Sequence, residues 1–251
     1  MSPELAALQL ENGRLQRELG QARAELEDFT YSVSHDLRAS LRHVNAYVQI
    51  IQEDLGDHVD AAMVAHLDTV SQAARQMGRQ IDGLMELSRL TRADLQWSSV
   101  DAGQLVRDVV AALAPASEGR TIDWQVVPDF PALRCDAVLV RQALMHLLSN
   151  AVKFTASRPI AQIKVQWQVQ VNGWCALTVS DNGVGFNPQY GKTLFRAFQR
   201  LHGAREFEGM GMGLALTRRI VERHGGAAWA IGAPDDGCSV SFTLPLAQSA
   251  D

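Results

Sequence analysis

The first thirty-three residues carry apolar side chains at alternating spacings of three and four. The series comprises Leu5, Leu8, Asn12, Leu15, Leu19, Ala22, Leu26, Phe29 and Val33. This is the a/d pattern of a coiled coil, whose seam is buried only against another helix. Asn12 occupies an a position, where a buried amide favours a fixed register and two strands. The pattern predicts that residues 1–33 form a long helix that pairs with a second copy.

Two further apolar repeats follow, from Val33 to Leu55 and from Met63 to Leu84. Gly56 is placed to end the first helix, and Asp60 is placed to start the next. Two helices joined by a short loop form a hairpin. Because one hairpin leaves its apolar seam open, two copies would bury both seams in a four-helix bundle. We therefore expect residues 29–95 to form a homodimer.

His35 stands where the first apolar repeat changes phase. Val33 and Leu37 share one helix face, and His35 lies about 200° around the helix from each. If Val33 and Leu37 face a core, His35 faces water, where a neutral imidazole is a good nucleophile toward phosphorus. Asp36 is placed to orient the ring or to take its proton. Taken alone, such a pair is usually an ordinary surface pair, so the function depends on the rest of the chain.

The composition argues against several classes of protein. A formal net charge of −5 leaves no basic footprint for nucleic acid. No apolar run approaches the length of a membrane span, and the N-terminus lacks the features of a signal peptide. The cysteines, Cys135, Cys175 and Cys238, match neither a metal-site spacing nor a disulfide framework. We expect a cytoplasmic protein without nucleic-acid partners or a membrane segment, whose upstream sensor domain is absent from this chain.

From residue 96 onward the periodicity is mixed. Helical patterns cover 101–113, 136–154 and 211–224, and alternating patterns typical of strands cover 121–127, 163–171, 174–180, 227–231 and 239–244. Asp101 and Asp136 are plausible N-caps. Asn172-Gly173 lies between two strand patterns and is a strong hairpin signal. The second half is therefore predicted to be an α/β domain with antiparallel strand pairs and helices on one face.

Three stretches in this half are weak evidence singly but agree with one another. Asn150 and Lys153 stand three residues apart on one predicted helix, so they can point the same way. The amide oxygen of Asn150 is a suitable ligand for Mg²⁺ held mainly by phosphates. The ammonium group of Lys153 can neutralise phosphate charge. These two residues predict one wall of a nucleotide pocket.

The other two stretches predict a base site and a phosphate site. Asp181 follows an apolar strand, where its carboxylate is suited to accept a hydrogen bond from an adenine amino group. Gly183 and Gly185 let the chain turn and the base approach the backbone. The stretch from Gly209 to Leu214 leads into a helix, whose free N–H groups and positive dipole end attract phosphate. Together the three stretches indicate a pocket for ATP.

This combination resembles the sensor histidine kinases of two-component signalling, and the second half resembles their ATP-binding domain of the GHKL superfamily. The H box, N box, first glycine box, F box and second glycine box of that family are similar, in order, to residues 34–38, 150–154, 181–185, 194–198 and 209–213. The sequences of residues 198–202 and 218–226 are similar to those of kinases attached to phytochrome photoreceptors. The resemblance implies a coiled-coil signalling helix at 1–33, a dimerisation and histidine-phosphotransfer domain at 29–95, and a catalytic ATP-binding α/β sandwich at 96–251.

The resemblance also implies a role for each box. His35 would be phosphorylated, with Asp36 as the base, and the phosphoryl group would pass to an aspartate in the receiver domain of a response regulator. Mg²⁺ would bind Asn150 through the ATP phosphates. ATP would contact Asn150, Lys153, Asp181, Gly183, Gly185, Gly209, Gly211, Gly213 and Leu214. Residues 187–208 would form a lid over ATP, anchored by Phe195 and Phe198, a role compatible with simple core packing.

The sequence departs from the family pattern in two places. His146 stands where a second N-box asparagine is common, and it lies either near the phosphates or on the wet surface of its helix. Ala39 and Ser40 replace the Thr-Pro that often follows the H-box arginine. Ala39 has no group to position the water that dephosphorylates a regulator, and the lack of proline predicts a straighter helix.

Three functions fit the motifs to different degrees. The leading hypothesis is an ATP:protein-histidine phosphotransferase that autophosphorylates His35. A GHKL-type ATPase that drives conformational change is an alternative, against which the H box and coiled coil argue. A dimerisation module switched by ATP without histidine phosphorylation is the third.

Overall fold

The computed structural model describes residues 3–55, 60–115, 119–203 and 206–247. Contacts divide the chain into two compact units, Met1–Arg89 and Leu90–Asp251. The division falls a few residues before the expected boundary at 95–96. This is because Thr91 and Ala93 are hydrogen-bonded to Arg219 and Arg223 of the second unit.

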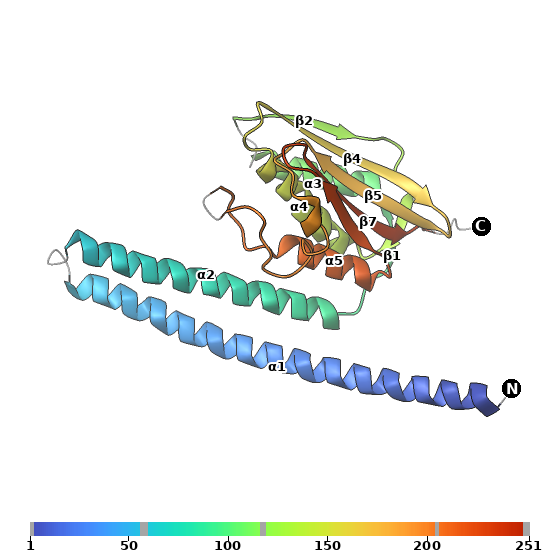
Figure 1. The fold of residues 1–251 in the computed structure, drawn as a ribbon, viewed down its shortest axis with the longest axis horizontal. Coiled ribbons are helices and arrows are strands. Elements are labelled where there is room, and N and C mark those ends of the chain that lie inside the picture. The colour runs from blue at the N-terminus through green and yellow to red at the C-terminus, as the bar shows by residue number, and fades with distance from the viewer. Residues whose placement is uncertain (1–2, 56–59, 116–118, 204–205, 248–251) are drawn as a thin grey trace. The chain divides into compact units, whose positions relative to one another are not determined.

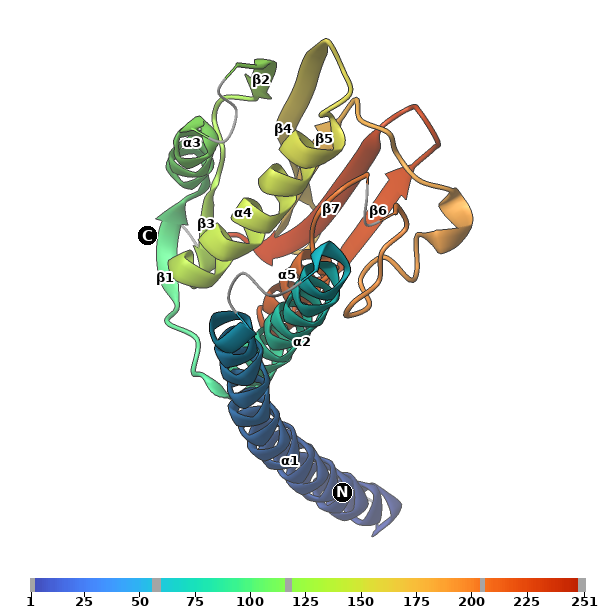
Figure 2. The ribbon, with the colours of Figure 1, turned by 90° about the vertical axis from the view of Figure 1, so that its left-hand side faces the viewer.

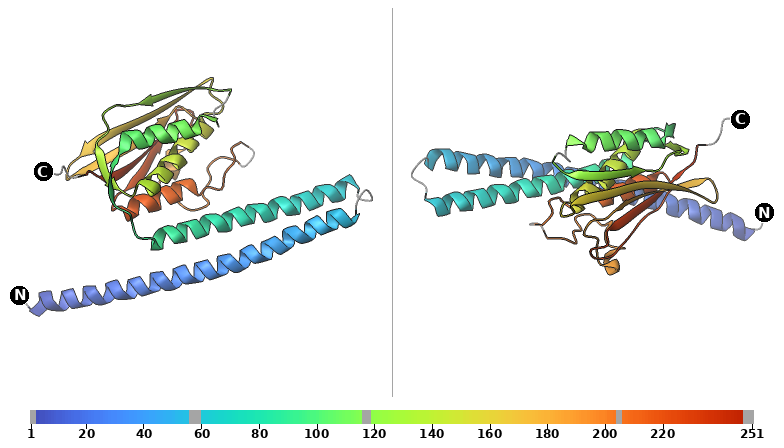
Figure 3. Two further views of the ribbon diagram at one scale, coloured as in Figure 1. Left: turned by 180° about the vertical axis from the view of Figure 1, so that it is seen from behind. Right: turned by 90° about the horizontal axis from the view of Figure 1, so that it is seen from above.

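The first unit is an antiparallel pair of helices, α1 (Pro3–Leu55) and α2 (Ala61–Arg92), and residues 90–92 of α2 are counted in the second unit. Figure 1 shows the hairpin, and the left view of Figure 3 shows that α1 continues well beyond the end of α2. The Asp60 carboxylate accepts a hydrogen bond from the Met63 N–H at 2.7 Å, as expected for the start of a helix. The expected end at Gly56 lies outside the described residues.

The hairpin buries only part of its apolar surface within one chain. Leu41, Val48 and Ala74 are buried. The a/d residues of the N-terminal repeat are mostly exposed, namely Leu8, Leu15, Leu19, Leu26, Phe29 and Val33. Large apolar side chains rarely stay in water in such a row unless a partner covers them. The exposed row is therefore the surface that the heptad pattern predicts for pairing.

In the described residues of the second unit, three helices cover one face of a mixed sheet. The sheet has the order β2-β4-β5-β7-β6, with β2 parallel to β4 and the other pairs antiparallel. Its strands are β2 (Thr121–Val126), β4 (Ile160–Gln170), β5 (Trp174–Asp181), β6 (Ala228–Gly232) and β7 (Cys238–Pro245). Figure 2 shows α3 (Ala102–Leu113), α4 (Ala137–Phe154) and α5 (Gly213–Arg223) on the same face of this sheet. The predicted α/β class and one-sided helix layer are confirmed.

Local sequence signals account for several element boundaries. Asp101 caps α3 through the Gln104 N–H at 2.9 Å, and Asp136 caps α4 through the N–H groups of Val138 and Leu139. Asn172 and Gly173 both have positive φ, at 69° and 79°. Two positive φ values are the signature of a type I′ hairpin turn.

The sequence-based prediction misses two strands and misplaces one helix start. The strands β1 (Ser98–Asp101) and β3 (Ala132–Cys135) pair antiparallel, and four residues are too few for a visible alternation. Residues 98–100, which lie just before the predicted helix at 101–113, are thus in a strand. The last helix begins at Gly213 and not at Gly211, because Gly211 has a φ of 74°, which no right-handed helix allows.

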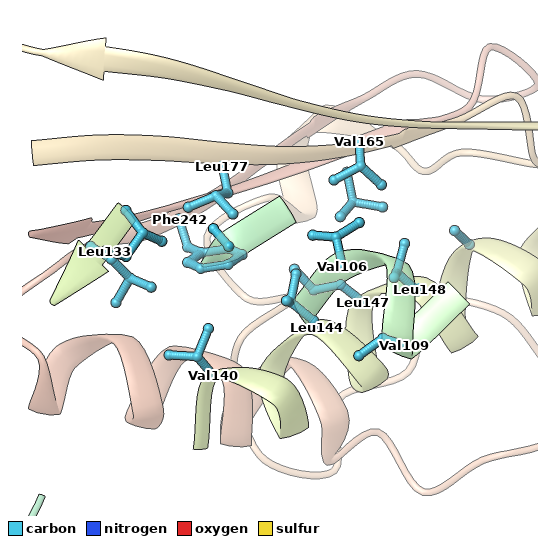
Figure 4. Close-up of a cluster of buried hydrophobic side chains, with 14 of the residues drawn as sticks. Val106, Val109, Leu133, Val140, Leu144, Leu147, Leu148, Val165, Leu177 and Phe242 are labelled. Carbon is cyan, nitrogen blue, oxygen red and sulfur yellow. The ribbon is translucent and has the colours of Figure 1, made fainter. Parts of the chain in front are cut away.

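The core of this unit lies between the sheet and the helices. It is built from side chains of α3, α4 and the inner sheet face, as Figure 4 shows. Val106, Leu144, Val165, Leu177 and Phe242 are each fully buried. Deleting such a side chain costs about 2–5 kcal/mol. The core therefore holds α4 rigidly against the sheet, which places the polar end of α4 beside the end of β5.

Candidate functional site

The first candidate centre is the His35–Asp36 pair on α1. The His35 side chain is 62% exposed, and its Nδ1 lies 3.3 Å from Oδ1 of Asp36. An ionised carboxylate only accepts hydrogen bonds, so this contact requires the proton on Nδ1. In the neutral ring, Nε2 then carries the free lone pair and faces water. The pair is therefore arranged for nucleophilic attack through Nε2.

The environment of this pair is only partly the predicted one. His35 faces water as expected, but Val33 and Leu37 are also exposed in the single chain, and Ser34 is buried at 1%. Val33 and Leu37 therefore do not face a core within one hairpin. The core predicted for them lies between two hairpins and requires a second copy of the chain. Arg38 pairs with Asp82 and so ties α1 to α2 one turn after the histidine.

The second candidate centre begins at the C-terminal end of α4, with Lys153. Its Nζ lies 4.4 Å from the centre of the Phe154 ring, and 3.3 Å from the point where a Cβ on Gly209 would stand. Burial lowers the pKa of Lys153, and the neighbouring Arg200 lowers it further, while Glu208 opposes both. Two cations held close together and partly away from water favour an anion between them. The structure thus brings the first and third predicted stretches together at a cationic site.

The first and second predicted stretches also meet. Burial raises the pKa of Asp181 to about 6, although hydrogen bonds from the N–H groups of Gly183 and Cys238 oppose the shift. The Gly183 N–H donates to Oδ1 of Asp181 at 2.8 Å. A Cβ on Gly183 would lie 2.6 Å from the carbonyl oxygen of Phe154, a distance that no side chain tolerates. Only glycine lets the end of α4 approach the Asp181 carboxylate this closely.

Gly185 completes this junction. Its φ is 61°, and a Cβ there would lie 1.9 Å from the carbonyl oxygen of Ala233. Its own carbonyl oxygen lies 2.9 Å from Nε2 of His202, which donates the hydrogen bond because a carbonyl only accepts. The sequence signalled a turn at Gly185, and the structure adds a tight contact with the β6–β7 turn.

The third stretch forms the entrance to α5. Gly209 and Gly211 have φ of 133° and 74°, and a Cβ on Gly211 would lie 2.4 Å from the carbonyl oxygen of Gln199. Among the described residues, no side chain caps the N-terminus of α5. Uncapped N–H groups at a helix start are a ready anion site. A Cβ on Gly213 would stand 3.5 Å from His146, so His146 lies beside this stretch. This position agrees with the interpretation that places His146 near the phosphates.

The described part of the predicted lid, residues 187–203 and 206–208, is mostly irregular and includes a short 3-10 turn, η3 (Pro188–Tyr190). Phe195 is 7% exposed, as an anchor should be. Phe198 is 38% exposed on left-handed backbone, so it does not act as an anchor here. Leu214, beyond the lid, is half-buried and packs against the core.

An aromatic cluster, absent from the sequence-based prediction, packs this segment against α4. The ring centres of Phe154, His202 and Phe207 lie 5.0–5.5 Å apart. Arg200 donates to the carbonyl of Phe207 at 2.7 Å.

Sequence reasoning also missed Arg158, which lies in the turn after α4. A single arginine in a loop carries no periodic signal, so nothing local distinguishes these contacts.

Two family models match the chain. "His Kinase A (phospho-acceptor) domain" matches residues 25–93, which include His35, and "Histidine kinase-, DNA gyrase B-, and HSP90-like ATPase" matches residues 135–248, which include the second centre. The chain belongs to the histidine kinases. Relatives of the kinase include Cyanobacterial phytochrome B of Nostoc sp. (30% identity, 93% of this chain, 31% of the relative) and Methanogenesis regulatory histidine kinase FilI of Methanothrix harundinacea (31%, 93% and 26%).

Solved structures agree with the fold of this histidine kinase. Full-length ShkA in complex with AMPPNP superposes with a TM-score of 0.64 at 24% identity, over 89% of this chain and 47% of that chain. The kinase spans about a third or less of the two curated relatives named above. Within the part of the kinase that the structure describes, no helix combines the length and apolar character needed to cross a membrane.

Proposed function

We propose that this chain is an ATP-dependent protein histidine kinase that phosphorylates its own His35 and passes the phosphoryl group to an aspartate of a response regulator. The observation that carries the proposal is the exposed His35–Asp36 pair, whose 3.3 Å contact leaves Nε2 nucleophilic. The same chain brings a desolvated carboxylate, Asp181, and two cations, Lys153 and Arg200, to the C-terminal end of α4. A nucleophile and a nucleotide site in one polypeptide are what phosphoryl transfer to protein requires.

The chemical step follows from the tautomer. The lone pair of His35 Nε2 forms a bond to the γ-phosphorus of ATP as the bond from that phosphorus to the bridging oxygen breaks, and ADP leaves. The ring would then be cationic until Asp36 accepts the Nδ1 proton. The product is a neutral phosphorylated imidazole ring. Attack by a regulator carboxylate on the same phosphorus returns the electron pair to Nε2.

The described residues include an acceptor for the base and donors for the phosphates of ATP. Asp181 is suited to accept a hydrogen bond from the adenine amino group, and its carboxylate is held by the Gly183 N–H. Lys153 and Arg200 would bind the phosphates together with the uncapped start of α5. ShkA, a protein of the same fold, was solved in complex with AMPPNP, which supports nucleotide binding by this fold.

Mg²⁺ fits the same pocket through one residue. Asn150 is half-buried on α4, one turn before Lys153, and its amide oxygen is a ligand type that Mg²⁺ accepts when phosphates supply the rest. When bound, Mg²⁺ neutralises charge on the phosphates. Lys153 then needs to compensate only what remains, which suits a cation whose pKa is lowered.

The working unit is proposed to be a homodimer. The exposed heptad row of α1, including Leu19 and Leu26, would be covered by the same row of a second copy. The receiver domain of a regulator would meet His35 from solvent, because that ring is exposed. Residues 1–33 would then transmit input to the histidine through a continuous helix.

The test is incubation with ATP labelled on the γ-phosphate. Label that is stable in base and lost in acid supports phosphohistidine. Release of inorganic phosphate without such label would support a GHKL-type ATPase, and nucleotide binding with neither would support an ATP-switched module. His35→Gln should abolish the label and leave nucleotide binding intact. His43→Gln is the matched control, because His43 is exposed on the same helix and should keep its label.

A further inference from the structure

One side chain joins the first glycine box, residues 181–185, to two other segments. Arg158 lies in the turn between α4 and β4, and its side chain is 30% exposed. Its Nε donates to the carbonyl of Asn182 at 2.7 Å, and its Nη2 donates to the carbonyls of Gly183 at 3.0 Å and Asp235 at 2.8 Å. We name these three hydrogen bonds the carbonyl clamp.

The clamp acts on backbone and not on a charge partner. The Asp235 carboxylate is 3.9 Å from the guanidinium group and 87% exposed, so this ion pair contributes little. In contrast, the Asp235 N–H donates to the carbonyl of Val184 at 2.8 Å, which ties the β6–β7 turn to the glycine box a second time. A planar guanidinium group with several donors is suited to holding carbonyls from separate segments. Lysine has a single ammonium group and cannot reproduce this geometry.

The clamped peptide also orients the base-binding carboxylate. The carbonyl of Asn182 and the N–H of Gly183 belong to one planar peptide unit. Arg158 holds the carbonyl side of that unit, and its N–H side donates to Oδ1 of Asp181 at 2.8 Å. Any rotation of the peptide therefore moves the hydrogen bond on which the carboxylate orientation depends. A carboxylate held in advance loses less entropy when it binds its partner.

We propose that Arg158 is a positioning residue for nucleotide selection, which holds the Asn182–Gly183 peptide so that Asp181 meets the amino group of adenine. The inference rests on the proposed function of this pocket as an ATP site. Arg158 does not need to touch the nucleotide. Its effect should appear as discrimination between purines that carry the 6-amino group and purines that lack it.

The test compares two ligands by calorimetry with the full-length chain and Mg²⁺. ADP carries the amino group, and purine riboside diphosphate lacks it but is otherwise the same. In wild type, ADP should bind more tightly, and Arg158→Met should lower the ratio of the two affinities by about tenfold, since one well-made hydrogen bond is worth about that much. Arg158→Lys, which keeps the charge, should lower the ratio nearly as far.

Arg120 provides a matched control. It is also partly buried, and it donates to the carbonyls of Val152 at 2.9 Å and Thr155 at 2.8 Å, but not to the glycine box or the β6–β7 turn. Arg120→Met should weaken both ligands equally, if at all, and leave the ratio unchanged. If Arg120→Met lowered the ratio of the two affinities as much as Arg158→Met does, the cause would be a general loosening of the ATP-binding unit. That result would overturn the proposal.

The remaining outcomes are also decisive. If wild type binds neither ligand, the proposed ATP site itself fails. If wild type binds both ligands equally, or if the ratio is the same in folded Arg158 variants, only the positioning role fails. Circular dichroism confirms folding before each titration. If Arg158→Met does not fold, Arg158→Lys alone carries the test, because it replaces the forked donor with a single group.

Discussion

Substituting alanine at Gly185 tests whether the glycine box is built by close packing or only by backbone conformation. Gly185 and Gly173 both have positive φ, 61° and 79°, so alanine is strained at either position. A left-handed alanine costs roughly 1–2 kcal/mol. A Cβ at Gly173 would meet no described atom within 4 Å. Gly173→Ala therefore measures the conformational cost alone.

Gly185→Ala adds a collision with backbone. Its Cβ would lie 1.9 Å from the carbonyl oxygen of Ala233 and 2.7 Å from that of Gly237. Neither oxygen can rotate away, so the β6–β7 turn must shift and the hydrogen bond from Asp235 to Val184 is strained or lost. Overpacking costs about 1–3 kcal/mol and the hydrogen bond about 1 kcal/mol. We expect Gly185→Ala to destabilise the ATP-binding unit by about 2–4 kcal/mol more than Gly173→Ala.

Urea unfolding followed by tryptophan fluorescence is the assay. All five tryptophans, Trp97, Trp124, Trp167, Trp174 and Trp229, lie in the unit Leu90–Asp251, so the signal reports that unit and not the hairpin. ADP binding should weaken in the Gly185 variant, because the turn that must move is clamped to the Asp181–Gly183 segment. Equal free energies of unfolding for the two variants, within about 0.5 kcal/mol, would refute the close-packing argument.

Three further predictions concern the hairpin and the pocket. Leu19→Asp should dissociate the dimer, because Leu19 is 52% exposed in the single chain and belongs to the heptad row; sedimentation that shows an unchanged dimer would contradict this. Ala39→Thr should speed phosphate release from a phosphorylated regulator in the His35→Gln background, since alanine has no group to hold the attacking water; no change would shift attention to Ser40. Burial raises the pKa of Asp181 to about 6, so this carboxyl is ionised at pH 7.5 and largely protonated at pH 5. The affinity for ADP should therefore fall as the pH is lowered from 7.5 to 5. In the Asp181→Asn variant only the titration of ADP itself remains. If the ADP affinity of this variant depended on pH as it does in wild type, Asp181 would be excluded as the acceptor.

Much of the candidate site was predictable because its chemistry is written in short local patterns. The heptads specify α1, aspartates cap α3 and α4, and Asn172-Gly173 makes the hairpin turn. Asn150 with Lys153, Asp181 with Gly183, and the Gly209–Gly213 stretch each carry a recognisable signal within a few residues. These signals depend on helix period, turn conformation and capping, which neighbouring residues decide among themselves.

The sequence by itself therefore determined the helices, the strong turns and the motif residues, and only the tertiary structure decided how they meet. The pairing of β1 with β3, the clamp of Arg158 on the glycine box and the contact of His202 with Gly185 join residues far apart in the chain. The exposure of Val33 and Leu37 likewise follows from what a single hairpin can cover. Local propensity does not encode such contacts, because their free energy comes from burial and hydrogen bonds that exist only after distant segments have packed.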